Sequence, residues 1–305
     1  MASAHPSLSV VIATRNRAPL LRLCLGAVAQ QEVPRESFEV VVVNNASEDD
    51  TPAVAEQEAS RHGFDLCLVH EPRIGLAVAR NRGAAEAAGE GIVFLDDDAL
   101  PRPGWLSAFR RRLIDERRSL VQGRIVARFA GGRPKWIGDR QVSRFGAYAQ
   151  TRETPVESFH GGNMGVTADV FRRVGGFREE LGLGATGLGE DTDFARRAID
   201  AGVGSVYEAQ AVVDHLIARR RATRGDLLRR CYRSGLSQPL FQSYTASLPR
   251  TIAGFVWHSS LRLCASAFAG TPSEQMDLTC DVVEHAGRVI QILRQSANQT
   301  MSDER

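Results

Sequence analysis

The stretch Ile92-Val93-Phe94-Leu95-Asp96-Asp97-Asp98 places three carboxylates directly after a run of four apolar residues. The apolar run predicts a buried strand, and ligands usually bind at the carboxyl ends of strands in open α/β sheets. Adjacent negative charges raise one another's pKa unless a cation neutralises them. Mg²⁺ or Mn²⁺ would serve, because one or two carboxylates and substrate phosphate oxygens typically hold such ions. For the triplet alone, the alternative is a solvated acidic turn.

The first hundred residues alternate short β-branched runs with amphipathic segments, which is typical of a parallel sheet with crossover helices. The expected strands are residues 8–13, 39–43, 65–69 and 92–95. The expected helices are residues 18–30, 51–62, 75–88 and 105–118. In a doubly wound sheet the loops after the strands carry the ligand site, which is then expected at residues 14–17, 44–50 and 96–99.

The middle of the chain is predicted to be less regular before the α/β pattern returns. A strand at 120–128 precedes the stretch 130–160, which is rich in Gly, Arg and aromatic residues and has little periodicity. We interpret this stretch as an irregular excursion that could face a substrate. Regular elements follow as helices at 168–174 and 191–201 and strands at 203–207 and 211–213.

The C-terminal third is predicted to be helical and rich in arginine. Seven arginines accompany a single acid, Asp226, between residues 219 and 233. Apolar residues along one face of this segment indicate a helix with a basic opposite face, and two more helices are expected at 252–268 and 276–293. The predicted organisation is an α/β domain over 1–216, a helical extension over 217–294 and a flexible tail over 295–305.

The basic helix is open to three interpretations. Its charge could be solvated on a helix that packs against the domain, could attract an anionic membrane, or could form a homodimer interface. The apolar stretch 251–269 contains His258 and Arg262, each costly at the centre of a bilayer. We therefore predict no transmembrane helix there.

Composition and cysteine usage indicate a globular protein of the cytoplasm. The chain has 305 residues, a net charge of +2, and 43% hydrophobic and 24% charged residues, which excludes a disordered class and gives no reason to expect nucleic-acid binding. The five cysteines lack C-x-x-C spacing and are expected to be reduced. No secretory signal follows Met1, so the expected location is cytoplasmic, with peripheral contact at the inner face of the membrane left open.

A second acidic cluster, Gly189-Glu190-Asp191-Thr192-Asp193, begins a predicted helix after a glycine-rich stretch. Carboxylates are favoured at a helix N-terminus, so helix capping alone is one explanation. The other is that one carboxylate serves as a general base on a loop that glycine keeps open to substrate. His215 follows the last predicted strand. A lone histidine is more often structural, although neutral imidazole suits Mn²⁺ as a ligand beside an aspartate pair.

Six segments in a fixed order resemble family 2 glycosyltransferases with the GT-A fold. They are residues 9–17 (SVVIATRNR), 41–47 (VVVNNAS), 75–83 (GLAVARNRG), 94–98 (FLDDD), 175–177 (GGF) and 189–193 (GEDTD). A single segment of this kind occurs in many unrelated proteins, but all six in this order are specific to the family. The resemblance covers residues 8–216. It implies an α/β fold of the GT-A type, a Rossmann-like, mostly parallel sheet flanked by helices, followed here by a C-terminal helical extension. The implied activity is an inverting transfer of a sugar from a nucleotide-diphosphate donor to a hydroxyl acceptor.

The resemblance also implies roles for individual residues. Asp191 would be the catalytic base with Glu190 as its neighbour, while a divalent metal, Mn²⁺ or Mg²⁺, would be bound by Asp96, Asp98 and His215. The implied donor-binding residues are Thr14, Arg15, Asn16, Asn44, Arg80, Asp96 and Asp97, of which Asp97 has no assigned contact. Arg80 and Asn81 would point hydrogen-bond donors toward the nucleotide. A cation for the diphosphate and a base for the hydroxyl are what this chemistry needs, and the two acidic clusters match those needs.

The donor base and the sugar pocket are less sharply defined. Where the family usually has an Asp that accepts a hydrogen bond from the base, this chain has Asn44, whose amide can accept or donate. UDP is favoured, with GDP and dTDP left open, and the acceptor could be a glycan, a lipid-linked molecule or a small molecule. His160, Gly161, Gly162 and Asn163 resemble the sugar-pocket segment of the family or form a simple glycine turn. Trp136 could stack on a sugar or pack within the protein.

Other function classes fit less well. A binding protein that had lost catalysis would be expected to relax the base or the metal residues, yet all of these are present. A nicotinamide oxidoreductase or a sugar nucleotidyltransferase needs a glycine-rich phosphate loop after the first strand, and residues 13–18 contain no glycine. The alternatives to the glycosyltransferase are therefore a catalytically inactive nucleotide-sugar-binding protein and a sugar nucleotidyltransferase.

Overall fold

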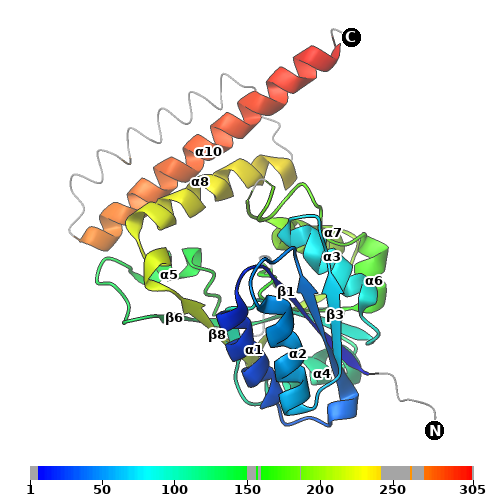
Figure 1. Ribbon diagram of the computed structural model, residues 1–305. Coiled ribbons are helices and arrows are strands. Elements are labelled where there is room, and N and C mark those ends of the chain that lie inside the picture. Colours follow the sequence, from blue (N-terminus) through cyan, green and yellow to red (C-terminus); the bar gives the residue numbers. More distant parts are fainter. Residues whose placement is uncertain are drawn as a thin grey trace. The chain divides into compact units, whose positions relative to one another are not determined.

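The computed structural model in Figure 1 describes residues 6–149, 156, 159–185, 187–241, 262 and 271–303 of the chain. The chain divides into two compact units. The first contains residues 1–128, 146–180 and 190–216, and the second contains residues 129–145, 181–189 and 217–305. Two short segments thus group with the C-terminal helices. The division into domains over 1–216, 217–294 and 295–305 stays a prediction.

Within the described residues, eight strands form one sheet in the order β3-β2-β1-β4-β7-β6-β8-β5. The parallel neighbours are β1 (Leu8–Thr14), β2 (Phe38–Asn44), β3 (Leu66–His70) and β4 (Gly91–Leu95). The remaining strands, β5 (Ala99–Pro101), β6 (Leu120–Phe129), β7 (Asn163–Thr167) and β8 (Ser205–Ile217), form the antiparallel pairs β4–β7, β6–β7 and β5–β8. The predicted α/β fold class is confirmed, and its parallel part is the first four strands.

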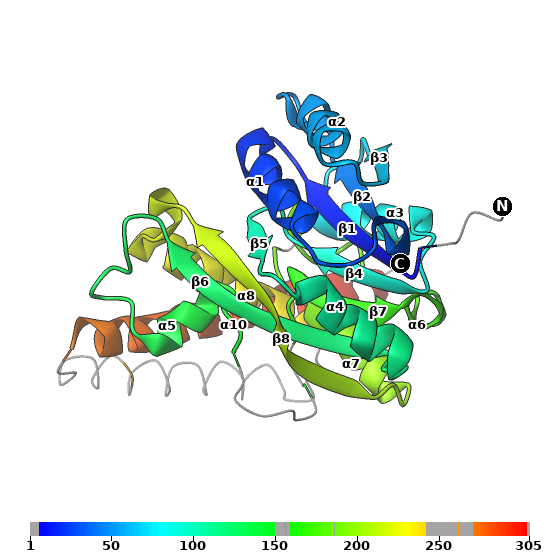
Figure 2. The same ribbon diagram turned by 90° about the horizontal axis from the view of Figure 1, so that it is seen from below.

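Helices cover both faces of the parallel strands because side chains alternate along each strand. In β1, the buried Val10 and Ile12 pack in one apolar cluster with α1 (Ala18–Ala29) and α2 (Thr51–His62), which lie side by side (Figure 1, Figure 2). Val11 belongs to a second cluster, formed with α3 (Leu76–Glu86), α6 (Ala168–Val174) and α7 (Glu190–Asp200). Because β1, β2 and β4 are paired in parallel, their carboxyl ends lie at the same edge of the sheet.

The helix predicted at 105–118 is interrupted. α4 (Trp105–Arg110) is followed by one π-helical turn, Arg111–Asp115. Arg111 and Arg112 both donate to the buried carboxylate of Glu208 at 2.5 Å. Consecutive residues of a regular α-helix do not face one neighbour, so this shared ion pair favours the π turn.

Two further differences concern polar segments. β8 is one continuous strand where the sequence predicts two, at 203–207 and 211–213, because Glu208 is buried by its ion pairs and does not break the strand. A short helix, α5 (Asp139–Arg144), lies within the segment 130–160 that was predicted to be irregular. Residues 150–155 and 157–158 of that segment lie outside the described residues.

The second unit contains the long helices α8 (Arg224–Phe241) and α10 (Pro272–Asp303). They pack closely through two glycines, since a Cβ on Gly235 would collide with the carbonyl of Glu284 and one on Gly287 with the carbonyl of Tyr232. Of the helix predicted at 252–268, all but Arg262 lies outside the described residues. None of the described helices combines the length and apolarity needed to cross a membrane.

α10 is longer at both ends than the predicted helix at 276–293. Thr271 and Glu274 form reciprocal hydrogen bonds, a capping box that starts the helix four residues earlier. After Gly287 the sequence has neither Gly nor Pro to end the helix, which continues to Asp303. The residues from 295 to 303, predicted to form a polar tail, are therefore helical.

Candidate functional site

The three aspartates after β4 have different partners. Asp96 is half-exposed, and its Oδ1 accepts a hydrogen bond from Nη2 of Arg80 at 2.7 Å. Asp97 and Asp98 are buried and share Arg17, whose Nη1 lies 2.5 Å from Oδ1 of Asp97 and 3.0 Å from Oδ2 of Asp98. The triplet is therefore not a solvated turn, because each carboxylate is paired with an arginine.

Asp97 connects two loops. Its Oδ2 accepts from the Thr14 hydroxyl at 2.8 Å and its Oδ1 accepts from Arg17. Burial raises the pKa of Asp97 to about 6, although Arg17 favours the charged form. Both residues were predicted to bind the donor, but the structure uses the side chains of Thr14 and Asp97 to fasten the loop after β1 to the loop after β4. Both side chains are buried, and their donor-binding roles stay predictions.

Asp98 and His215 face one another where β5 pairs with β8. Nε2 of His215 lies 3.3 Å from Oδ1 of Asp98, and the Leu216 N–H donates to the Asp98 carbonyl at 2.7 Å. One carboxylate oxygen and one imidazole nitrogen form a donor set that suits Mn²⁺. Across the described part of the chain, no group of three or more His, Cys, Asp or Glu side chains could hold a metal. The pair fits a metal ion whose coordination a substrate phosphate completes.

Arg17 is a site residue that the sequence analysis did not single out. Its guanidinium contacts the two buried aspartates of the triplet. Burial lowers the pKa of Arg17, but the charges of Asp97 and Asp98 raise it above its ordinary value. The side chain therefore stays charged. The available signal was an arginine in the loop after the first strand, at the sheet edge where three carboxylates also lie.

The second acidic cluster lies at the start of α7. Asp191 is half-buried, and its Oδ2 accepts from the Gly161 N–H at 2.8 Å while its Oδ1 accepts from the Thr192 N–H at 2.7 Å. Glu190 is buried and accepts from Nη1 of Arg80 at 2.7 Å. Burial and the charge of Asp191 raise the pKa of Glu190 to about 7. Arg80 therefore touches both acidic clusters.

Gly161 and Gly162 lie against both clusters as well. A Cβ on Gly161 would lie 2.5 Å from Nη1 of Arg80, and a Cβ on Gly162 would lie 2.5 Å from Oδ2 of Asp96. Glycine is the residue that allows such close approach. The two glycines predicted to line a sugar pocket are thus next to the residues expected to act on the donor.

The two residues that flank this glycine pair differ from each other. His160 is half-buried, with its ring 5.1 Å from the ring of Tyr148. Asn163 is fully buried; it accepts from the Trp105 indole at 2.8 Å and donates to two backbone carbonyls. Asn163 was predicted to line the sugar pocket, but its amide is used entirely within the core. These hydrogen bonds connect the start of β7 to α4, β6 and β8, and the sugar-pocket role of Asn163 stays a prediction.

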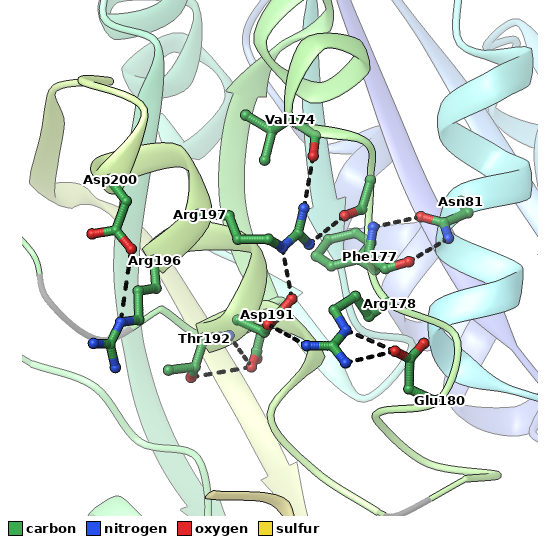
Figure 3. Close-up of polar contacts among 12 residues, drawn as sticks. Asn81, Val174, Phe177, Arg178, Glu180, Asp191, Thr192, Arg196, Arg197 and Asp200 are labelled. Atoms are coloured by element: carbon green, nitrogen blue, oxygen red, sulfur yellow. Dashed lines mark hydrogen bonds and ion pairs between the residues drawn. The ribbon is translucent and has the colours of Figure 1, made fainter. Parts of the chain in front are cut away.

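Asn81, next to Arg80 on α3, clasps the backbone of Phe177. Its Nδ2 donates to the Phe177 carbonyl and its Oδ1 accepts from the Phe177 N–H, each at 2.8 Å (Figure 3). Both terminal nitrogens of Arg80 donate hydrogen bonds to carboxylates. The pair of hydrogen-bond donors predicted to reach a nucleotide is therefore engaged within the protein.

The loops after β1 and β2 are fastened to each other. Asn16 adopts a left-handed conformation with φ 53°, and its side-chain oxygen accepts from the Glu48 N–H at 2.7 Å. Its own N–H donates to the Ser47 hydroxyl, while Oδ1 of Asn44 accepts from the Ser47 N–H at 3.0 Å. Arg15 is exposed. The donor-binding roles of Arg15, Asn16 and Asn44 stay predictions.

Trp136 belongs to the second unit. There the guanidinium of Arg224 lies 5.9 Å from the centre of one of its rings. A cation over an indole face is a stabilising packing contact. The stacking of Trp136 on a sugar stays a prediction.

The first unit therefore carries two chemically different groups. Asp98 and His215 bring a carboxylate oxygen and an imidazole nitrogen together, while backbone N–H groups orient the carboxylate of Asp191. Arg80 joins the two clusters. A displacement with a phosphate leaving group needs charge stabilisation at that group and a base for the nucleophile.

Comparisons with known proteins identify the family and the fold. The model of the family described as "Glycosyl transferase family 2" matches residues 9–175. Glycosyltransferase AglE of Haloferax volcanii is 28% identical, with coverage of 84% of this chain and 81% of the relative. A mannosyltransferase from Pyrobaculum calidifontis, solved with GDP-Man and Mn²⁺, superposes with a TM-score of 0.67 at 22% identity, over 95% of this chain and 88% of its own. TarS of S. aureus, solved with UDP-GlcNAc, superposes with a TM-score of 0.55 at 17% identity, over 79% of this chain and 68% of TarS.

Proposed function

The chain belongs to glycosyl transferase family 2 and is a glycosyltransferase of the GT-A fold, and we propose that it moves a sugar from a nucleotide diphosphate to a hydroxyl with inversion. The observation that carries the proposal is the single guanidinium of Arg80 between the two acidic clusters. A site for the leaving group and a site for the nucleophile are thereby held close together.

Asp191 is the proposed general base. The N–H groups of Gly161 and Thr192 orient its carboxylate, which takes the proton from the acceptor hydroxyl. The acceptor oxygen then forms its bond to the anomeric carbon as the bond from that carbon to the diphosphate oxygen breaks. Attack from the face opposite the leaving group inverts the configuration. Glu190 supports this step by holding Arg80.

Asp98 and His215, together with Asp96, are the residues proposed to hold a divalent metal, Mn²⁺ or Mg²⁺. When bound, the metal supplies positive charge that offsets the charge on the leaving diphosphate. Asp96 has one oxygen bonded to Arg80 and a half-exposed side chain, which also suits it to a ribose hydroxyl. The mannosyltransferase and its Mn²⁺ support the metal proposal by analogy of fold.

The proposed donor is a UDP-sugar, with a GDP-sugar as the main competitor. UDP-GlcNAc in one structural neighbour and GDP-Man in another support a nucleotide-sugar donor and leave the base open. The acceptor is proposed to be a glycan, a lipid-linked molecule or a small molecule with a free hydroxyl.

A donor screen with product analysis tests the function. Each UDP-, GDP- and dTDP-sugar is incubated with Mn²⁺ and a panel of hydroxyl acceptors, and the anomeric configuration of any product is read by NMR. The proposal expects one base to dominate and the product to have the configuration opposite to that of the donor. A product that retains the donor configuration contradicts the single displacement with Asp191 as base.

A further inference from the structure

We propose that Arg80 is a positioning residue that holds the catalytic base against the donor side of the site, and that it does not bind the nucleotide. The proposal rests on the glycosyl transfer proposed above. It differs from the role that the sequence implied for Arg80, and the two roles predict different kinetics.

The first step concerns accessibility. Arg80 is 4% exposed, and its Nη1 and Nη2 donate to Glu190 and Asp96 at 2.7 Å each. Gly161 lies so close that a Cβ there would contact the guanidinium, and the ring of Phe177 lies 5.8 Å from the guanidinium carbon. With carboxylates at both ends, a glycine backbone and an aromatic ring around it, the guanidinium has little surface left for a ligand. Its planar fork is suited to bridge two fixed carboxylates.

The second step connects Arg80 with the base along two routes. Glu190 precedes Asp191 at the first turn of α7, so the ion pair from Arg80 to Glu190 fixes the backbone that carries the base. Gly161, which lies against the guanidinium, also donates its N–H to Oδ2 of Asp191. A shift of Arg80 would therefore move the base through its neighbour and through its hydrogen-bond donor.

The third step is a parallel link between the same two helices. Asn81 of α3 holds the N–H and carbonyl of Phe177, while Arg197 of α7 donates to the carbonyls of Val174 and Gly176 at 2.7 and 2.6 Å (Figure 3). Residues 174–177, where α6 ends, are thus held by α3 on one side and by α7 on the other, and we call this arrangement the clamp. The clamp thereby gives α3, which carries Arg80, a second connection to α7, which carries Glu190.

Arg80→Lys is the sharpest test. An ammonium keeps the charge but cannot form the two-armed bridge, so the base should lose its position while the buried carboxylates stay compensated. We expect kcat to fall about 10- to 100-fold, in line with the effect of a misplacement of about 1 Å. Because Arg80 also pairs with Asp96 on the donor side, the donor Kd should rise as well, but by a smaller factor than kcat falls. Arg82→Lys, on the exposed side of the same helix, is the matched control and should keep both values. A donor Kd raised tenfold or more at unchanged kcat would overturn the proposal.

A double-mutant cycle of Arg80→Lys with Glu190→Gln separates the mechanisms further. If Arg80 acts through Glu190, the double variant should lose no more kcat than the worse single variant. Losses that multiply would contradict the proposal. If Arg80→Lys does not fold, Glu190→Gln is tested alone. Its kcat should then fall by the factor expected above for Arg80→Lys, with the donor Kd unchanged. A changed donor Kd would contradict the positioning role of Arg80. If the wild type transfers no sugar, the proposed function fails by itself, and the same cycle read as unfolding temperature still tests the coupling.

Discussion

Consecutive aspartates can be recognised in a sequence, but the directions in which their side chains point cannot be predicted from it. Asp96, Asp97 and Asp98 lie in a loop, where neither the period of a strand nor that of a helix fixes the side chains. The sequence predicted a candidate site beside a strand end, and the structure places the three aspartates directly after β4. It listed Asp97 among the donor-binding residues without an assigned contact, which stays a prediction; the structure buries Asp97 with Arg17, an interaction between residues eighty positions apart.

Asp97→Asn is expected to change how stability depends on pH. The pKa of Asp97 is raised by burial to about 6 from 3.8, so the folded protein binds this proton more tightly than the unfolded chain. Its contribution is fully present below pH 3.8 and is lost as pH rises through 6. Without added metal, wild type should gain on the order of 2 to 3 kcal/mol more than the variant between pH 7 and pH 4. Chemical denaturation across this range measures it, and parallel curves for the two proteins would contradict the assignment.

Gly161→Ala is expected to disturb the site and the fold together. The added methyl would push on Arg80, and over-packing of this kind costs about 1 to 3 kcal/mol. Gly26→Ala in α1 is the matched control, because a Cβ there meets nothing within 4 Å and alanine favours a helix interior. Thermal unfolding should show a loss for the first variant and a small gain for the second. Equal stability of both variants would show that the site has space for a methyl group at residue 161 and would contradict the prediction.

Elements with clear local signals were predicted well. The parallel strands follow from continuous apolar runs, and the helices between them from amphipathic spacing. The capping box at Thr271 was present in the sequence and was overlooked. The π turn after α4 and the unbroken β8 could not be predicted in the same way, because Glu208 joins arginines almost a hundred residues away.

Asn81→Ala tests the clamp between α3 and α7. Its loss leaves the N–H and carbonyl of Phe177 without their partner, which typically costs about 1 to 3 kcal/mol for a buried group. Arg82→Ala on the exposed side of the same helix should change stability by less than about 0.5 kcal/mol. Urea denaturation compares the two variants. A smaller loss for Asn81→Ala than for the control would contradict the clamp.

At the scale of the whole molecule, we expect the proposed metal site to be incomplete until substrate binds. In the described part of the chain no three His, Cys, Asp or Glu side chains are grouped closely enough to hold a metal, and Asp96 already accepts from Arg80, so Mn²⁺ alone should bind weakly. Mn²⁺ with a nucleotide diphosphate at about 100 times its Kd should stabilise the fold by about 2.7 kcal/mol, a shift of several degrees in Tm. Differential scanning fluorimetry with and without EDTA measures this. A full shift with Mn²⁺ alone, or with nucleotide in EDTA, would contradict the shared site.

The arginine-rich segment belongs to the second unit, and several of its side chains have partners there. Arg224 lies over Trp136, Arg229 pairs with Asp226 at 2.7 Å, and Arg230 donates to the Arg144 carbonyl. These contacts favour packing among the three interpretations of the charge. Membrane contact and a homodimer stay proposals. Co-sedimentation with anionic vesicles that is lost when residues 219–221 are replaced by alanine would support the membrane role.

The base assignment is tested most directly by Asp191→Asn, with transfer and donor binding measured on the same preparation. The account predicts that transfer falls at least about 100-fold, because the proton acceptor is lost, while calorimetry finds the donor Kd within about 3-fold of wild type. Asp200→Asn at the exposed end of α7 is the matched control and should transfer normally. Near-normal turnover by Asp191→Asn would contradict the central claim that this carboxylate activates the acceptor.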